Sequence, residues 1–103
     1  MNIKICNLRY ESCKYPYDVR VDRASILGNP FRMENEGRRD EVCDKYEAYF
    51  NKSFNENTRF RNAVMDLVKT YRKYGQLRLF CWCAPKRCHA DYIKRVAERI
   101  ADQ

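Results

Sequence analysis

The chain has 103 residues and a net charge of +7, and 45% of its residues are hydrophobic. This length supports one core and excludes two independent domains, and the composition excludes a disordered tail. The first residues lack the apolar run of a secretory signal, and no stretch approaches the roughly 18 apolar residues of a membrane span. We therefore expect a cytoplasmic protein with no membrane partner, whose six cysteines are reduced thiols, metal ligands or core residues rather than disulfides.

In chain order, the pattern predicts two strands, two helices, a strand and a final helix. Alternating apolar residues indicate strands at 3–8 and 18–22, and a long irregular segment follows at 23–38. Apolar residues at helical spacing indicate two helices that occupy most of the stretch from Arg39 to Tyr74, with Gly75 ending the second one.

The stretch 76–83 is predicted to be a strand with apolar residues on both faces, which is typical of a central strand covered on two sides. The last helix begins near Cys88 and runs to the end of the chain. Together these elements predict a single α/β domain over residues 1–103. Its small layered sheet has three or four mostly parallel strands flanked by three helices.

Residues 80–92, FCWCAPKRCHADY, contain three thiols and the only histidine of the chain. They join the predicted central strand to the last helix, and ligands of open α/β sheets bind at such junctions, beyond the carboxyl ends of the strands. Amides at the start of the helix, in residues 88–90, lack helical partners and can bind an anion. Lys86 and Arg87 add positive charge beside them.

Three uses of these thiols are open. A helix N-terminus stabilises a thiolate, so Cys88 is the best candidate for a nucleophile, with His89 as acid and base and Asp91 as an orienting carboxylate. Zinc takes four sulfur or nitrogen ligands, and the candidate set is Cys81, Cys83, Cys88 and His89. Alternatively, Cys81 and Cys83 pack as small apolar side chains.

Two motifs resemble a known family. Residues 21–31 are similar to an Arg-x-Ser-x-x-Gly-Asn-Pro-Phe signature, and residues 81–91 are similar to a Cys-x-Cys-x-Pro-x-x-Cys-His-x-Asp signature. Both belong to a family of small phage and bacterial proteins filed as domain of unknown function 4326. The resemblance implies one shared site made of Arg23, Ser25, Asn29, Phe31, Cys83, Cys88, His89 and Asp91.

Residues 58–103 carry eleven basic and four acidic groups, a balance that favours phosphate-bearing partners. We expect a cationic, thiol-lined pocket for a nucleotide-like or other phosphorylated ligand, and the phage setting implied by the resemblance adds a nucleotide-derived defence signal to that class. The expected ligand-binding residues are Arg23, Ser25, Asn29, Phe31, Trp82, Lys86 and Arg87. Two alternatives are an enzyme of nucleotide or nucleic-acid metabolism that uses Cys88 and His89, and a zinc-stabilised nucleic-acid-binding module.

Overall fold

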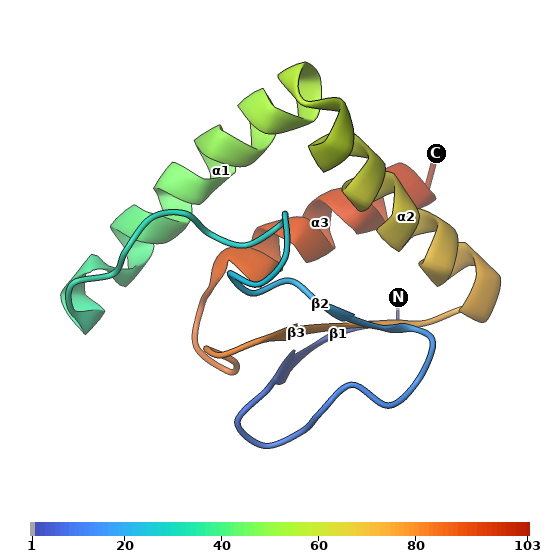
Figure 1. Cartoon of the computed structure of the whole chain (residues 1–103), viewed down its shortest axis with the longest axis horizontal. Coiled ribbons are helices and arrows are strands. Elements are labelled where there is room, and N and C mark those ends of the chain that lie inside the picture. The colour runs from blue at the N-terminus through green and yellow to red at the C-terminus, as the bar shows by residue number, and fades with distance from the viewer. Residues whose placement is uncertain (1) are drawn as a thin grey trace.

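Three parallel strands form the sheet of this protein, in the order β1-β3-β2 (Figure 1). The computed structural model describes residues 2–103. The strands are β1 (Ile3–Asn7), β2 (Asp18–Arg20) and β3 (Leu77–Cys81), and the helices are η1 (Glu36–Arg38), α1 (Arg39–Glu56), α2 (Thr58–Tyr74) and α3 (His89–Ala101). The α/β fold with three main helices and a parallel sheet is confirmed. No helix within residues 2–103 is both long enough and apolar enough to cross a membrane.

The boundaries of α2 show why the helical pattern predicted it well. Its first turn is capped by Asn57, whose Oδ1 accepts a hydrogen bond from the amide of Phe60 at 3.1 Å. Gly75 ends the helix in the left-handed conformation (φ 71°) and donates its amide to the carbonyl of Tyr71 at 2.8 Å. The buried face between these two caps consists of Phe60, Val64, Leu67 and Val68.

The central strand β3 is covered on both faces, as its sequence predicts, but by different structures. Leu77 and Leu79 are fully buried in the core beneath the helices. On the opposite face, the connection between β1 and β2 supplies the cover (Figure 1). There the Arg78 guanidinium lies 5.4 Å from the ring centre of Tyr15 and 5.0 Å from that of Phe80. A helix on each face is therefore not needed to bury a strand of this kind.

The carboxyl ends of β2 and β3 lie at the same edge of the sheet, and three segments converge there: the loop after β2, the start of α1 and the turn between β3 and α3. Asn7, the last residue of β1, holds that turn, because its side-chain amide donates to the carbonyls of Ala84 (2.8 Å) and Trp82 (3.3 Å). The turn itself is closed by the Lys86 amide, which donates to the Cys83 carbonyl at 2.9 Å. All three strands thus position this edge.

Candidate ligand pocket

A pocket of about 280 Å³ opens at this edge of the sheet. Its wall combines the loop after β2, the first turns of α1, and the segment that joins β3 to α3. The lining residues are Asp22, Arg23, Asn29, Phe31, Met33, Arg39, Val42, Cys43, Trp82, Cys83, Cys88 and His89. The predicted position beyond the carboxyl ends of the strands therefore holds a cavity.

The loop after β2 owes its shape to Gly28. A Cβ atom at this position would lie 2.4 Å from the carbonyl oxygen of Asp22, so the loop can fold back on itself only with glycine here. Asn29 then closes a local turn by accepting the Phe31 amide on its Oδ1 at 2.9 Å. The buried hydroxyl of Tyr46 anchors the loop from α1 by donating to the Leu27 carbonyl at 2.6 Å.

Trp82 is an exposed aromatic side chain that is nevertheless held in place. It is 58% exposed, and its Nε1 donates to Oδ2 of Asp22 at 2.9 Å. The guanidinium of Arg20 is the main cause that lowers the pKa of Asp22, with the Trp82 hydrogen bond as a further one, so this buried group is a carboxylate at neutral pH. A fixed indole ring is therefore presented at the pocket.

The thiols of Cys81, Cys83 and Cys88 form one cluster, in which they differ in access to solvent. The Sγ atoms of Cys81 and Cys88 are 3.4 Å apart, and both side chains are buried, with exposed fractions of 1% and 5%. Cys83 is half-buried and lines the pocket. Interactions with the thiols of Cys81 and Cys83, together with burial, raise the pKa of Cys88.

Negative charge in this cluster is best placed on Cys83. Its pKa is lowered mainly by the hydrogen bond from the Cys88 thiol, and further by the guanidinium of Arg39. The hydrogen bond from Cys88 also lowers the pKa of Cys81, but Cys81 is more deeply buried. Cys88, expected from its helix N-terminal position to be the reactive thiol, instead has a raised pKa, because its interactions with Cys81 and Cys83 and its burial favour the protonated form.

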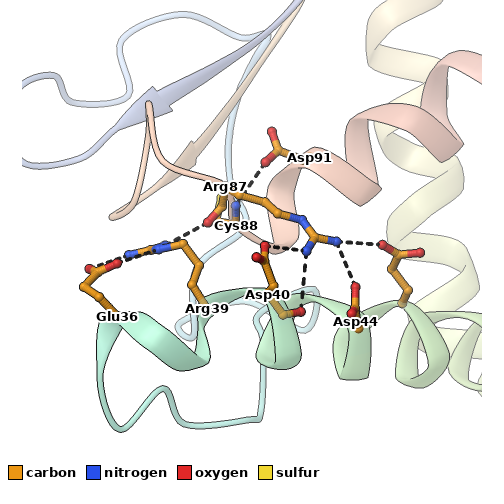
Figure 2. A network of polar contacts seen from close by, with 8 residues as sticks. Glu36, Arg39, Asp40, Asp44, Arg87, Cys88 and Asp91 are labelled. Atoms are coloured by element: carbon orange, nitrogen blue, oxygen red, sulfur yellow. Dashed lines mark hydrogen bonds and ion pairs between the residues drawn. The ribbon is translucent and has the colours of Figure 1, made fainter.

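Arg39, which the sequence reasoning missed, ties the pocket together. Its Nε and Nη2 donate to the Glu36 carboxylate at 2.9 and 2.8 Å, and its Nη1 donates to the Arg87 carbonyl at 2.7 Å (Figure 2). The same guanidinium lines the pocket together with Cys83 and helps to lower the pKa of that thiol. It therefore links the start of α1 to the thiol segment, and no local motif marks it.

His89 is a neutral, oriented imidazole. Its Nε2 hydrogen-bonds to the carbonyl of Val21, and because a carbonyl only accepts, the proton is on Nε2. Burial lowers the pKa of His89, and its ring packs against that of Tyr46 with centroids 5.0 Å apart. Among residues 2–103 Nδ1 has no hydrogen-bond partner, so its lone pair is left to accept a proton or a hydrogen bond.

The pocket brings together the two signature segments of the sequence, although 50 or so residues separate them. A family model described as a domain of unknown function (DUF4326) matches residues 6–99, which is most of the chain. The chain belongs to the DUF4326 family. No curated protein and no solved structure matches it.

Seven of the predicted site residues of this DUF4326 protein line the pocket: Arg23, Asn29, Phe31, Trp82, Cys83, Cys88 and His89. Ser25 does not. Its Oγ accepts the Leu27 amide at 3.1 Å, and it lines a second, smaller cavity beside α2. Ser25 shapes the signature loop rather than contacting a ligand in the pocket.

Lys86 and Arg87, both expected to bind phosphate, face carboxylates of η1 and α1 instead. Lys86 lies 3.3 Å from Glu36. Arg87 pairs with Asp40 (2.9 Å), Asp44 (3.0 Å) and Glu47 (3.2 Å), and Figure 2 shows it reaching along α1. Neither cation lines the pocket, because these acidic partners become neighbours only in the folded chain.

The start of α3 is capped by its own side chains. The carboxylate of Asp91 accepts the Cys88 amide at 3.0 Å (Figure 2), and the Cys88 side chain completes a capping box with the Asp91 amide. The Cys88 amide is therefore already paired within the helix. Asp91 is a cap, and anion binding at the other amides of residues 88–90 stays a prediction.

A zinc site is not assembled by the residues that were expected to form it. Within residues 2–103 no group of three or more His, Cys, Asp and Glu side chains is arranged to hold a metal ion. His89 directs Nε2 at the Val21 carbonyl, and Cys88 donates its proton within the thiol cluster. Of the expected ligands, Cys81 and Cys88 thus contact each other, while His89 is engaged with the backbone.

Proposed function

We propose that this DUF4326 protein binds a small nucleotide-like ligand, with a planar base against Trp82 and a phosphate at Arg23. The observation that carries the proposal is the Trp82 ring, which is 58% exposed yet fixed by its 2.9 Å hydrogen bond to Asp22. An apolar ring held in solvent does not by itself stabilise the folded chain, whereas a fixed ring at a cavity is suited to stacking with a base.

The charge at the pocket supports an anionic group on that ligand. Arg23 is exposed and donates to the Phe31 carbonyl at 3.0 Å, and among residues 2–103 it has no carboxylate partner within ion-pair distance. Its charge is therefore not cancelled by an acidic neighbour, unlike that of Arg39, which is paired with Glu36. A phosphate at Arg23 would form a charge-assisted contact.

The size of the pocket favours one nucleotide unit. Its volume of about 280 Å³ lies just below the range of roughly 300–1,000 Å³ that is usual for ligand pockets. A dinucleotide would exceed it, and a strand of nucleic acid would place only one unit inside. Mononucleotides and signalling molecules derived from them are the ligand class that fits.

Isothermal titration calorimetry with nucleoside monophosphates, the matching nucleosides and inorganic phosphate tests this proposal. At least one monophosphate should bind, and its nucleoside should bind about tenfold more weakly because the contact with Arg23 is lost. Trp82→Ala and Arg23→Ala should each weaken binding about tenfold or more. Tyr10→Ala, at an aromatic side chain that is 75% exposed and outside the pocket, and Arg32→Ala, on the same loop as Arg23, serve as matched controls.

The proposal is wrong if no nucleotide in the panel binds, or if the control variants lose as much affinity as Trp82→Ala and Arg23→Ala.

Salt dependence of the affinity separates a mononucleotide ligand from a nucleic-acid partner. Binding through one phosphate should weaken about in proportion to salt concentration, whereas a polymer contacting many cations loses affinity far more steeply. A single-stranded oligonucleotide that binds tightly with such a steep slope would favour the nucleic-acid alternative.

Catalysis is a second candidate, supported by the pairing of Cys83 and His89 in one pocket. Cys83 carries the thiol whose pKa is lowered by the Cys88 hydrogen bond and by Arg39, and His89 offers a neutral Nδ1. A nucleophile and a base at one cavity are the usual parts of thiol chemistry. If the protein turns over its nucleotide, Cys83→Ser should abolish product formation, measured by mass spectrometry, while leaving affinity within a few-fold.

A further inference from the structure

The thiol cluster has a graded arrangement that nucleotide binding does not use. Cys83 is half-buried at the pocket wall, and Cys88, in the same wall, is 5% exposed. Cys81 lies behind them, 1% exposed, with its Sγ 3.4 Å from that of Cys88. An accessible thiol therefore shares the pocket wall with a buried thiol, which itself contacts a third.

We propose that hydroperoxides oxidise the thiol of Cys83, and that the thiol of Cys88 then reacts with the oxidised Cys83 to form an intramolecular disulfide. The proposal rests on the pocket wall that Cys83 and Cys88 share, which admits a small oxidant to Cys83, and on the closed turn that connects the two residues. It is independent of the nucleotide, because neither step requires a ligand to be bound.

The first step oxidises sulfur and reduces the peroxide. The Cys83 thiolate takes the outer peroxide oxygen as the O–O bond breaks, which gives a sulfenic acid and an alcohol, or water from hydrogen peroxide, with one proton supplied by solvent. In the second step the Cys88 sulfur attacks the Cys83 sulfur. The S–S bond forms, the S–O bond breaks, and the hydroxyl leaves with the Cys88 proton as water.

The surroundings of Cys83 suit the first step. Arg39 lines the same pocket as Cys83, and its guanidinium is fixed by Glu36 and by the Arg87 carbonyl. A held cation beside a partly exposed thiol favours the thiolate, which is the form that reacts with peroxides. Cys13 is more exposed than Cys83, but burial and the nearby Asp18 raise the pKa of Cys13. Exposure alone therefore does not select the reactive thiol.

The turn between β3 and α3 suits the second step. The 2.9 Å hydrogen bond from the Lys86 amide to the Cys83 carbonyl folds the chain back after Cys83, so that Cys83 and Cys88 line the same pocket wall. Cys43 also lines the pocket, on α1, but Cys88 is the thiol whose interaction with Cys83 lowers the pKa of Cys83. Cys88 is therefore the resolving thiol.

The test oxidises reduced protein with stoichiometric hydrogen peroxide and follows it by intact mass and by peptide mapping without reductant. Wild-type protein should lose two hydrogen atoms, regain them with dithiothreitol, and show a crosslink from Cys88. Because Cys81 can exchange into that bond, the Cys81→Ser variant isolates the first product, in which the crosslink should join Cys83 to Cys88. A crosslink of Cys83 to Cys43, or only intermolecular products, would overturn the proposal.

Variants of the two reacting thiols test the order of events. In Cys88→Ser the reaction should stop at a sulfenic acid on Cys83, trapped as its dimedone adduct, and in Cys83→Ser disulfide formation should slow by roughly tenfold or more. Cys13→Ser is the matched control and should leave the crosslink unchanged. Dimedone labelling mainly at Cys13 would overturn the role of Cys83. The wild-type crosslink map requires no variant to fold.

Discussion

Three thiols within one cluster differ in charge because they differ in partners. The interactions of Cys88 with Cys81 and Cys83, together with its burial, raise its pKa, so Cys88 favours the protonated form. The interaction with the Cys88 thiol and the guanidinium of Arg39 both lower the pKa of Cys83. Single contacts, rather than the position of a thiol along its helix, decide which sulfur is reactive.

Replacing Arg39 should make the Cys83 thiol less acidic. In Arg39→Gln the pH midpoint for alkylation of Cys83 should move upward by about one pH unit, because the cation that favours the thiolate is gone while the Cys88 hydrogen bond remains. Peptide-resolved mass spectrometry after iodoacetamide pulses at several pH values measures it. Arg38→Gln, which removes an exposed guanidinium paired with Glu41 at 2.8 Å, should leave the midpoint in place. Equal midpoints for both variants would show that Arg39 does not tune this thiol.

The hydroxyl of Tyr46 is expected to stabilise the signature loop. Tyr46→Phe removes the 2.6 Å hydrogen bond to Leu27 and leaves a carbonyl without its partner in a buried region, which should cost about 1–2 kcal/mol in the free energy of unfolding. Urea denaturation followed by circular dichroism measures the loss. Tyr49→Phe, on the same helix at a half-buried side chain, should change the unfolding free energy by less than about 0.5 kcal/mol. A similar small effect for both variants would contradict this role.

The site residues that the sequence revealed are those inside the two motifs, since each motif folds as a local unit. Arg39 carried no such signal, because its contacts with Cys83 and with the Arg87 carbonyl are made across more than 40 positions of the chain. The same limit applies to Arg87, which the sequence predicts to bind phosphate: its acidic partners on α1 are equally distant in sequence. Local rules locate a site, whereas its charges are set by tertiary neighbours.

At the scale of elements, the loop after β2 is defined by how closely its backbone approaches itself. Gly28 leaves no room for a side chain, since a Cβ would also lie 2.6 Å from the Cα of Arg23. The neighbouring atoms belong to backbone and cannot rotate away. The loop and the pocket wall that it forms therefore depend on glycine at this one position.

Gly28→Ala should accordingly disturb both stability and the pocket. We expect a loss of about 1–3 kcal/mol in the free energy of unfolding, as for other overpacked sites, and weaker binding of any nucleotide that wild-type protein binds. Thermal and urea unfolding measure the first effect. Gly37→Ala is the matched control, because its Cβ would meet only the Asn35 side chain, at 3.1 Å. If the two alanine variants were equally stable, the loop could adjust and the close approach would not be essential.

The helices and strands were largely predictable because their patterns are local. The apolar face of α2 and its stop at Gly75 follow from spacing and from one conformational preference. The loop that covers the second face of β3 was not predictable, since residues 8–17 have no periodic pattern. What buries Phe80 there is a stack of Arg78 and Tyr15, which depends on the tertiary fold.

At the scale of the whole molecule, the buried carboxylate of Asp18 connects the elements on the second face of β3, which the loop between β1 and β2 covers. Asp18 begins β2. Its carboxylate accepts a hydrogen bond from the guanidinium of Arg78 on β3 at 2.8 Å, and hydrogen bonds from the amides of Lys14 and Tyr15 at 2.8 and 3.0 Å. Its side chain is fully buried in this contact. The edge strand, the central strand and the covering loop therefore share one charged group.

The pKa of Asp18 follows from these opposing contributions. Burial, the largest of them, raises it, but the hydrogen bonds from Arg78, Lys14 and Tyr15 together lower it below the usual value for an aspartate. A carboxyl whose pKa is lower in the folded state stabilises the fold above its unfolded pKa of about 3.9. This stabilisation is lost as the pH falls through the folded value.

Asp18→Asn should therefore destabilise the protein at pH 7 by about 2 kcal/mol, the usual loss for a charged hydrogen-bonded contact. The gap from wild type should stay constant down to about pH 5 and narrow below about pH 4, because only the wild-type group is then being protonated. Urea unfolding at pH values from 3 to 7 measures it, with the exposed Asp66→Asn on α2 as the control. If the difference in unfolding free energy between wild type and Asp18→Asn were the same at pH 3 and pH 7, the packing of the Asp18 side chain, rather than its charge, would hold the two strands and the loop together.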